Sequence, residues 1–298
     1  MHRIGKIAFI VVGIVVATAA WSIAQQDMSD VQIETIHVAD GVYMLVGQGG
    51  NIGLSVGDDG PFVIDDQFAP LTEKIQAAIA AVTDGDVRFV LNTHWHGDHT
   101  GGNENFGKAG AMIVAHENVR RRLNPAEFRD VMGRTEQAPP EALPVVTFTD
   151  AVNLYWNGEN IRVFHVDAAH TDGDVIIHFS NANVVHMGDN FFRGRYPFID
   201  VDSGGGINGM IEAGDRVLAM VNSDTQIIPG HGPLSTPDDL SDFRNMLITV
   251  RDRVRAMLND GMSIDEIVAA KPTSDLDAVW GQDPDGFVTN AARSLSGQ

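Results

Sequence analysis

Short apolar runs separated by glycine-containing turns fill the first part of the chain. Their length and their alternation of apolar and polar residues are typical of β-strands in a meander. The predicted strands are residues 33–38, 42–46, 52–56 and 62–64. Residues 71–82 have the apolar spacing of a helix, and residues 87–91 are expected to form another strand.

The second part of the chain has the same order of strands followed by helices. Residues 112–115 are expected to form a strand, residues 116–123 a helix, and the proline-rich stretch 124–144 a surface excursion. The later predicted strands are residues 152–156, 161–166, 175–179, 184–186 and 226–228. Helices are predicted at residues 207–221, 238–258 and shortly after Ser263.

A polar cluster follows the strand predicted at residues 87–91. The segment THWHGDHTGG, residues 93–102, contains His94, His96, Asp98 and His99. Two histidines two residues apart can reach one metal ion, while the Asp and His that follow turn toward a second ion. Packing alone does not explain three histidines and an aspartate within six residues and among glycines. The spacing therefore predicts two metal ions.

The motif resembles the signature of the metallo-β-lactamase superfamily. This resemblance implies two ligand sets that share one bridging residue. They are His94, His96 and His170 for the first metal, Asp98, His99 and His231 for the second, and Asp189 between them. A bridging aspartate is similar to the glyoxalase II-like and lactonase-like branches. The implied fold class is α/β, a four-layer αββα sandwich of two mixed sheets with helices outside.

The motif differs from those of two other branches of the family, and these differences restrict the reactions that we expect. The Cys-containing β-lactamases have cysteine where this chain has Asp189, and the chain contains no cysteine. A β-lactam substrate is therefore not implied by the motif alone. The flavodiiron branch has a similar motif, HxExDH, with a glutamate at the position of His96. The histidine in this chain therefore disfavours an oxidoreductase.

Two adjacent cations would make a bridging hydroxide available near neutral pH and would polarise a substrate carbonyl. No protein nucleophile is then needed, and the chain lacks a G-x-S-x-G elbow. Asp98 is expected to act first as a ligand, and also to orient the attacking water or accept its proton. The predicted cofactors are two Zn²⁺ ions, with iron or manganese as alternatives.

Residues 190–206, directly after the bridging aspartate, are the candidate substrate loop. Its candidates for an apolar wall and for pairing with a substrate carboxylate are Phe191, Phe192, Tyr196, Arg193 and Arg195. An ordinary aromatic core with solvated arginines is the alternative interpretation. Gly49, Gly50 and Gly53 resemble the position of a hairpin that covers the substrate in the β-lactamase branch, and they predict a short flap.

Two aspartates and one histidine near the motif need separate interpretations. Asp65 and Asp66 end a predicted strand, and they are either outer partners of the ligand histidines or turn residues. His186 lies three residues before Asp189, so strand alternation turns it to the opposite face and argues against a ligand role.

The N-terminus predicts export. Arg3 and Lys6 precede an apolar run at residues 7–20 and a small-residue cleavage signal, so residues 1–24 are expected to be a signal peptide. A retained anchor, with membrane contact through that segment, is the alternative. Cleavage removes two basic residues and changes the formal net charge from −20 to −22. This acidity argues against nucleic acid and anionic lipid as partners.

Together these features predict a periplasmic or secreted dinuclear zinc hydrolase, with residues 25–298 as one domain. The predicted substrate is a small molecule with an activated carbonyl. A β-lactam-like cyclic amide is the first candidate, because export would place the enzyme where β-lactams act. A lactone, ester or thioester is the alternative that the bridging aspartate favours. The alternatives of other classes are an iron-dependent oxidoreductase and a non-catalytic binding module.

Overall fold

The computed structural model describes residues 28–124 and 138–297. The compact unit that carries the histidine motif comprises residues 31–298. The predicted signal peptide, residues 1–24, and most of the predicted excursion lie outside the described residues. No helix in the described part has both the length and the apolar character needed to span a bilayer.

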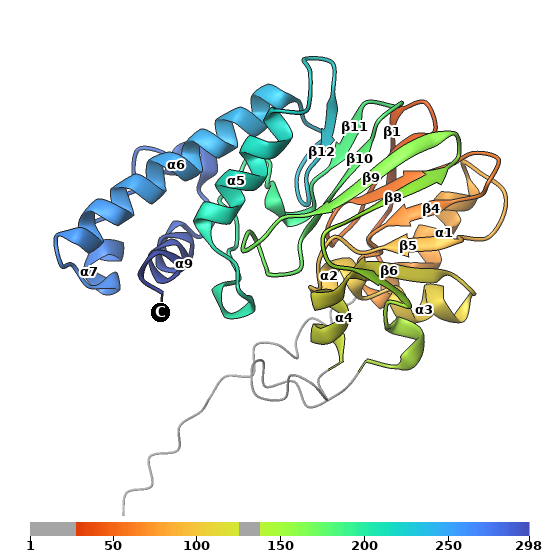
Figure 1. Ribbon diagram of the computed structural model, residues 1–298, viewed down its shortest axis with the longest axis horizontal. Coiled ribbons are helices and arrows are strands. Elements are labelled where there is room, and N and C mark those ends of the chain that lie inside the picture. Colours follow the sequence, from red (N-terminus) through yellow and green to blue (C-terminus); the bar gives the residue numbers. More distant parts are fainter. Residues whose placement is uncertain (1–27, 125–137, 298) are drawn as a thin grey trace, which may run out of the picture. The chain divides into compact units, whose positions relative to one another are not determined.

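Two β-sheets form the centre of this unit (Figure 1). The seven-stranded sheet has the order β1-β2-β3-β4-β5-β6-β7 and contains β1 (Glu34–Ala39), β2 (Val42–Val46), β3 (Ile52–Ser55), β4 (Phe62–Ile64), β5 (Phe89–Leu91), β6 (Met112–His116) and β7 (Val146–Phe148). The five-stranded sheet has the order β12-β11-β10-β9-β8 and contains β8 (Ala151–Trp156), β9 (Glu159–His165), β10 (Val175–Phe179), β11 (Val184–His186) and β12 (Gln226–Ile228).

Both sheets are mixed. In the larger sheet, pairs from β1 to β4 are antiparallel and pairs from β4 to β7 are parallel. In the smaller sheet, β11 and β12 are parallel and the other pairs are antiparallel. Parallel neighbours end at the same edge, so the loops after β4 and β5 start side by side, as do those after β11 and β12.

Helices lie on the outer faces of the two sheets (Figure 1). The helices are α1 (Thr72–Ala80), α2 (Gly97–Thr100), α3 (Asn103–Lys108), α4 (Glu117–Leu123), α5 (Ile207–Leu218), α6 (Pro237–Asn259), α7 (Ile264–Ala269), α8 (Asp277–Trp280) and α9 (Pro284–Ser296). Short 3₁₀ helices are η3 (Ala69–Leu71), η4 (Pro140–Ala142), η5 (Gly188–Asn190) and η6 (Val201–Ser203). In Figure 1, α5, α6 and α9 lie beside the smaller sheet, and α1 and α3 lie beside β4 to β6.

Strand alternation divides the apolar residues between two cores. One core lies between the sheets and includes Met44 and Ile64 from the larger sheet with Val163 and Ile177 from the smaller one. The opposite faces of β9, β10, β11 and β12 pack against α5, α6 and α9. The prediction of two mixed sheets with flanking helices is therefore confirmed.

The sequence pattern missed α9. Glycine, threonine and asparagine within it lower its intrinsic helix propensity. The helix is instead stabilised by Pro284 in its first turn, by Asp283, whose side chain accepts a hydrogen bond from Gly286 N, and by buried packing. Its buried residues are Phe287, Val288, Ala291 and Ala292.

The inter-sheet core gives a prediction for stability. Ile177 is fully buried, so Ile177→Ala should lower the free energy of unfolding by about 2–5 kcal/mol. Tyr155→Ala, at a side chain that is 75% exposed on β8, should change it by about 0.5 kcal/mol or less. Urea unfolding of the metal-free proteins measures both values, and equal unfolding midpoints would contradict this account of the core.

Candidate metal centre

The structure brings together all seven predicted ligands at one edge of the sheets. They come from the motif after β5, the β9–β10 loop, η5 after β11, and the loop after β12. Two groups result, His94, His96, His170 and Asp189 in the first, and Asp98, His99 and His231 in the second. Within each group the ligand atoms lie within 4.8 Å of one another.

The backbone of the motif explains how adjacent residues serve two groups. His96 is extended and precedes the single turn of α2, and His99 N donates to His96 O at 3.0 Å. This turn reverses the chain after His96 and directs Asp98 and His99 toward the second group. Trp95, between the ligands His94 and His96, is buried and packs against Ala115 and its neighbours.

Asp189 lies between the two groups, with one carboxylate oxygen toward each. Its Oδ2 is 3.5 Å from His170 Nε2 and 3.9 Å from His94 Nε2. Its Oδ1 is 3.1 Å from His99 Nε2 and 3.5 Å from His231 Nε2. This is the arrangement that a carboxylate bridging two ions requires.

The ligand atoms lie so close together that a metal ion between them would be more favourable than their direct contact. His96 Nδ1 is 3.1 Å from His94 Nε2 and 2.9 Å from His170 Nε2, and His99 Nε2 is 3.4 Å from His231 Nε2. Unprotonated nitrogens at such distances repel through their lone pairs. Asp189 Oδ1 is buried, and no described residue makes a well-angled hydrogen bond to it. Three nitrogens with a shared carboxylate, and two nitrogens with two carboxylates, are suitable ligand sets for Zn²⁺.

Outer partners fix the orientation of four ligand rings. In each case the nitrogen that faces away from the ligand group has a polar neighbour. The pairs are His94 Nδ1 with Thr93 Oγ1 at 3.0 Å, His96 Nε2 with Asp200 Oδ2 at 2.8 Å, His99 Nδ1 with Asp65 Oδ2 at 2.7 Å, and His170 Nδ1 with Phe198 O at 2.8 Å. The sequence analysis named Asp65 among these partners but missed Asp200.

The two neighbouring aspartates after β4 have different contacts. Asp65 has a left-handed backbone (φ 61°), and its Oδ1 accepts a hydrogen bond from Thr93 N at 2.7 Å. It therefore joins the start of the motif to His99. The side chain of Asp66 accepts a hydrogen bond from Gly102 N at 2.9 Å, and its backbone N donates to His99 O at 3.0 Å, so it does not contact a histidine ring. Burial raises the pKa of Asp66 well above its usual value.

The candidate substrate loop divides between the site and the protein interior. Phe192, Arg195 and Tyr196 line a cavity of about 390 Å³ beside the ligands. Phe191 does not, because its side chain is fully buried against Phe243 of α6. Phe192 and Tyr196 thus lie where the predicted apolar wall requires them, and the prediction is corrected for Phe191.

Arg193 also lies outside the cavity lining. Its guanidinium pairs with Asp239 at 2.6 Å, in the first turn of α6. This correction leaves Arg195 as the arginine of the loop that faces the cavity.

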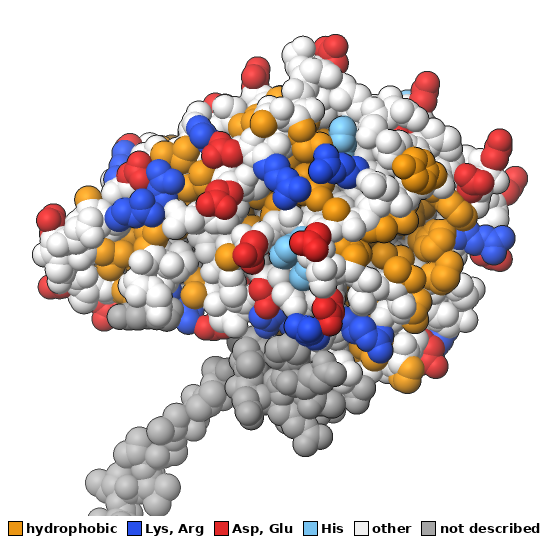
Figure 2. All heavy atoms as spheres, viewed as in Figure 1, with side chains coloured by type: hydrophobic (Ala, Val, Ile, Leu, Met, Phe, Trp, Pro, Cys, Tyr) orange, Lys and Arg blue, Asp and Glu red, His pale blue; other side chains and the backbone are white. Residues whose placement is uncertain are grey.

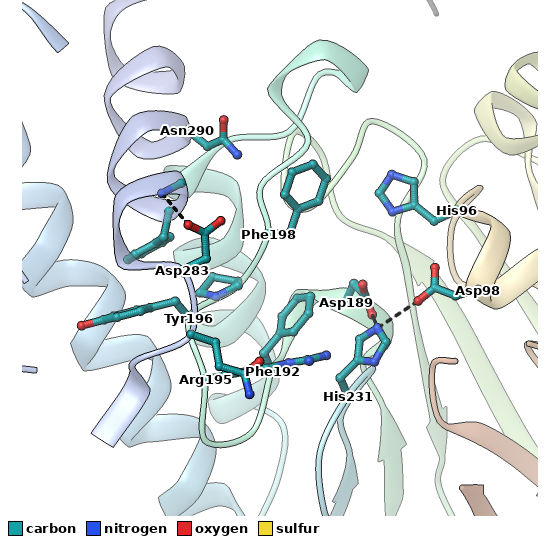
Figure 3. A pocket seen from close by; sticks show the side chains of 14 residues that line it. His96, Asp98, Asp189, Phe192, Arg195, Tyr196, Phe198, His231, Asp283 and Asn290 are labelled. Atoms are coloured by element: carbon teal, nitrogen blue, oxygen red, sulfur yellow. Dashed lines mark hydrogen bonds and ion pairs between the residues drawn. The ribbon is translucent and has the colours of Figure 1, made fainter. Parts of the chain in front are cut away.

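The cavity extends from the ligands to α9 and the residues just before it. Figure 3 shows His96, Asp98, Asp189 and His231 on one side, Asp283 and Asn290 on the other, and Phe192 and Phe198 between them. Sequence reasoning missed Phe198 and the whole C-terminal side of the cavity. Figure 2 shows acidic side chains around the histidines visible on this face.

The loop between β2 and β3 does not form the predicted flap. Gly50 N donates to Asp98 O at 3.0 Å, and a Cβ on Gly50 would lie 2.0 Å from the ring of His99. A Cβ on Gly49 would lie 2.6 Å from Asp98 O. These glycines let the backbone press against the second ligand group, so the loop supports the ligands. His186 contacts Asn51 O at 3.1 Å and lies outside both groups, as strand alternation predicts.

The two ligand groups differ in their affinity for protons. Burial lowers the pKa of His94 well below its usual value and that of His170 to about 4, despite the nearby Asp189. Burial also tends to lower the pKa of His99 and His231. Nearby carboxylates, of which Asp189 has the largest effect, outweigh burial and raise both pKa values.

The acids of the centre are ionised. Burial opposes ionisation of Asp98, but the neighbouring His99 and His231 outweigh it and lower the pKa of Asp98 to about 2. Burial opposes ionisation of Asp189 as well, and the same two histidines hold its pKa well below the usual value.

The architecture and the paired ligand groups define a dinuclear His/Asp metal site of the metallohydrolase type. Residues 46–242 match the family model described as the metallo-beta-lactamase superfamily, and the chain belongs to this superfamily. Its His/Asp site is intact, with all seven predicted ligands in the two groups.

The chain matches only part of the length of its curated relatives. The chain is 29% identical over 109 residues to a hydroxyacylglutathione hydrolase from Pelagibacter ubique, covering 36% of this chain and 37% of the relative. It is 27% identical over 168 residues to a hydroxyacylglutathione hydrolase from Polaromonas sp., covering 54% of this chain and 55% of the relative.

Solved structures share the fold at low sequence identity. A metallo-beta-lactamase from Pontibacter korlensis superposes with a TM-score of 0.60 and 19% identity, covering 73% of this chain and 99% of that structure. A stereoselective inverting sec-alkylsulfatase from Pseudomonas sp. has a TM-score of 0.67 and 17% identity, covering 88% of this chain and 50% of that structure.

The opposite pKa shifts predict different pH dependence for the two metal positions. The first group's buried His94 and His170 are already neutral at pH 7, so neither should release a proton when metal binds between about pH 6 and 8. In the second group, protons on His99 and His231 compete with the ion, so its affinity should rise with pH until the raised pKa values are passed.

Calorimetric titration of the metal-free protein with Zn²⁺, in buffers of different ionisation enthalpy, measures the protons released at each step. Proton release concentrated in the second step is the expected result. The same proton release in both steps would refute the assignment.

Proposed function

We propose that this protein hydrolyses a thioester or ester of a small molecule, using two Zn²⁺ ions held by the two ligand groups. The observation that carries the proposal is the position of Asp189, whose two oxygens face the two groups at the end of an accessible cavity. Bound ions would supply Lewis acidity toward the substrate carbonyl and would acidify a water molecule.

Asp98 is suited to two tasks in this reaction. Its Oδ2 lies 3.2 Å from His231 Nε2, so it can hold the second ion together with that histidine. Its side chain is 27% exposed and lines the cavity, whereas His99 is fully buried. Because its low pKa keeps it ionised, Asp98 can accept a hydrogen bond from the attacking water and orient it.

The cavity favours a substrate with an apolar group beside the reacting carbonyl. Phe192 stacks on His231, with ring centroids 5.3 Å apart, and Phe287 stacks on Tyr196 at 4.9 Å. Phe198 stands beside His96 at the mouth and is 54% exposed. An exposed phenyl ring next to a ligand offers apolar surface that a bound substrate would cover.

Arg195 gives this cavity one cationic side chain. Its guanidinium lies over the Phe192 ring, 5.3 Å from the centroid. Among the described residues no carboxylate forms an ion pair with it, in contrast to Arg193. We infer that Arg195 binds an anionic group of the substrate, such as a carboxylate.

Two considerations favour a thioester or ester over a cyclic amide. The partial matches include two hydroxyacylglutathione hydrolases, and a carboxylate stands where the Cys-containing β-lactamases have cysteine. The described β2–β3 loop contributes no residue to the cavity lining, which agrees with an open site. A β-lactam stays the second candidate, because Arg195 could pair with the carboxylate of such a substrate. Export to the periplasm, through the predicted signal peptide, would give access to it.

A substrate panel tests the reaction. The Zn²⁺-loaded protein should hydrolyse acyl thioesters and aryl esters faster than lactones and β-lactams, and His96→Ala should lose at least about 100-fold in kcat/KM because it removes a ligand. Faster cleavage of β-lactams would favour the second candidate. Oxygen consumption by an iron-loaded protein without hydrolysis would support an oxidoreductase and overturn the proposal.

Phe198→Ala tests the apolar contact. The variant should raise KM for a thioester with a phenyl-bearing acyl group about 10-fold, equivalent to about 1.4 kcal/mol, and change kcat little, because the ring contributes binding only. Acetyl thioesters should be much less affected. Val279→Ala is the matched control, since this exposed apolar side chain does not line the cavity. Equal losses for both acyl groups would contradict the assigned contact.

A further inference from the structure

Asp200 has a contact that places it directly behind a metal ligand. Its Oδ2 lies 2.8 Å from His96 Nε2, while His96 Nδ1 faces His94 and His170. The carboxylate of Asp200 is buried, and it also accepts a hydrogen bond from Ser203 N. A carboxylate that accepts a hydrogen bond from Nε2 holds the proton there and leaves Nδ1 free to bind metal.

The backbone of Asp200 reaches a second ligand of the same group. Asp200 N donates to His170 O at 3.0 Å, and His170 Nδ1 donates to Phe198 O at 2.8 Å. Asp200 Oδ1 also accepts from Ser203 N at 3.1 Å, which holds the carboxylate in place at the start of η6. Asp200 therefore contacts two histidines of the first group, His96 and His170, which lie on separate segments.

The second ligand group has an equivalent carboxylate from elsewhere in the fold. Asp65, at the end of β4, contacts His99 Nδ1 at 2.7 Å. Each group thus has one histidine oriented by an aspartate, but Asp65 is fully buried under the motif and Asp200 lies on the loop that also forms the cavity wall. The two aspartates can be altered separately.

We propose that Asp200 is a positioning residue for the first metal position, where it orients His96 and directs Nδ1 of that ring toward the other ligands. The proposal concerns metal binding and does not depend on the identity of the substrate. It predicts that loss of the carboxylate charge weakens the first metal position and leaves the second unchanged.

The test uses Co²⁺ as the probe and Asp200→Asn as the variant. Asparagine keeps an oxygen for Ser203 N but places no negative charge on His96 Nε2. In a His231→Ala background, which weakens the second group, Asp200→Asn should lower the Co²⁺ affinity of the first group by about 10–100-fold. Competition with a chromophoric chelator measures the affinity, and the visible absorption of bound Co²⁺ reports its coordination, both without substrate.

Two controls separate positioning from folding. Asp202→Asn lies on the same turn, where Asp202 pairs with Arg293 and contacts no ligand, so its Co²⁺ affinity should match that of the parent. In a His170→Ala background, which disrupts the first group, Asp200→Asn should have little effect on the remaining site. Urea unfolding of the metal-free proteins shows whether the variants fold. A folded Asp200→Asn protein with unchanged Co²⁺ affinity and absorption would overturn the proposal, as would equal weakening in both backgrounds.

Discussion

The structure depends on the convergence of lone-pair donors that repel one another unless protons or metal ions lie between them. Three imidazole nitrogens meet within 3.1 Å at His96, and two more meet at 3.4 Å between His99 and His231. The fold keeps them there because hydrogen bonds on the far side of the rings leave little rotational freedom. Metal binding relieves the repulsion that folding creates, so the ions stabilise the same geometry that binds them.

The two metal positions are supported by different parts of the chain. The second position depends on the larger sheet, through Asp65 after β4 and the glycines of the β2–β3 loop. The first depends on the segment after β11, through Asp200 and the carbonyl of Phe198. Phe198 also lines the cavity, so the segment that supports the first position forms part of the cavity wall as well.

The seven ligands were predictable from sequence because the motif puts four of them in six residues and the resemblance supplies the other three. Apolar alternation identified most strands for a similar reason, since it is a local signal. Asp200, Phe198 and α9 were missed. The first two lie in irregular backbone without periodicity, where nothing local distinguishes Asp200 from Asp202. Arg193 and Arg195 likewise differ only through Asp239, a partner distant in sequence.

The metal ligands and the far wall of the cavity therefore come from different segments of the chain. The family match ends at residue 242, after the last ligand, whereas α9 begins at Pro284 and provides Phe287 and Asn290 to the cavity. The matched region contains all seven ligands, whereas the lining residues on the side away from them lie beyond it. Residues with weak helix propensity form α9 because its apolar face is buried against α6 and α5, and that packing fixes the far wall. A change in α9 can thus alter the far wall of the cavity without disturbing a ligand.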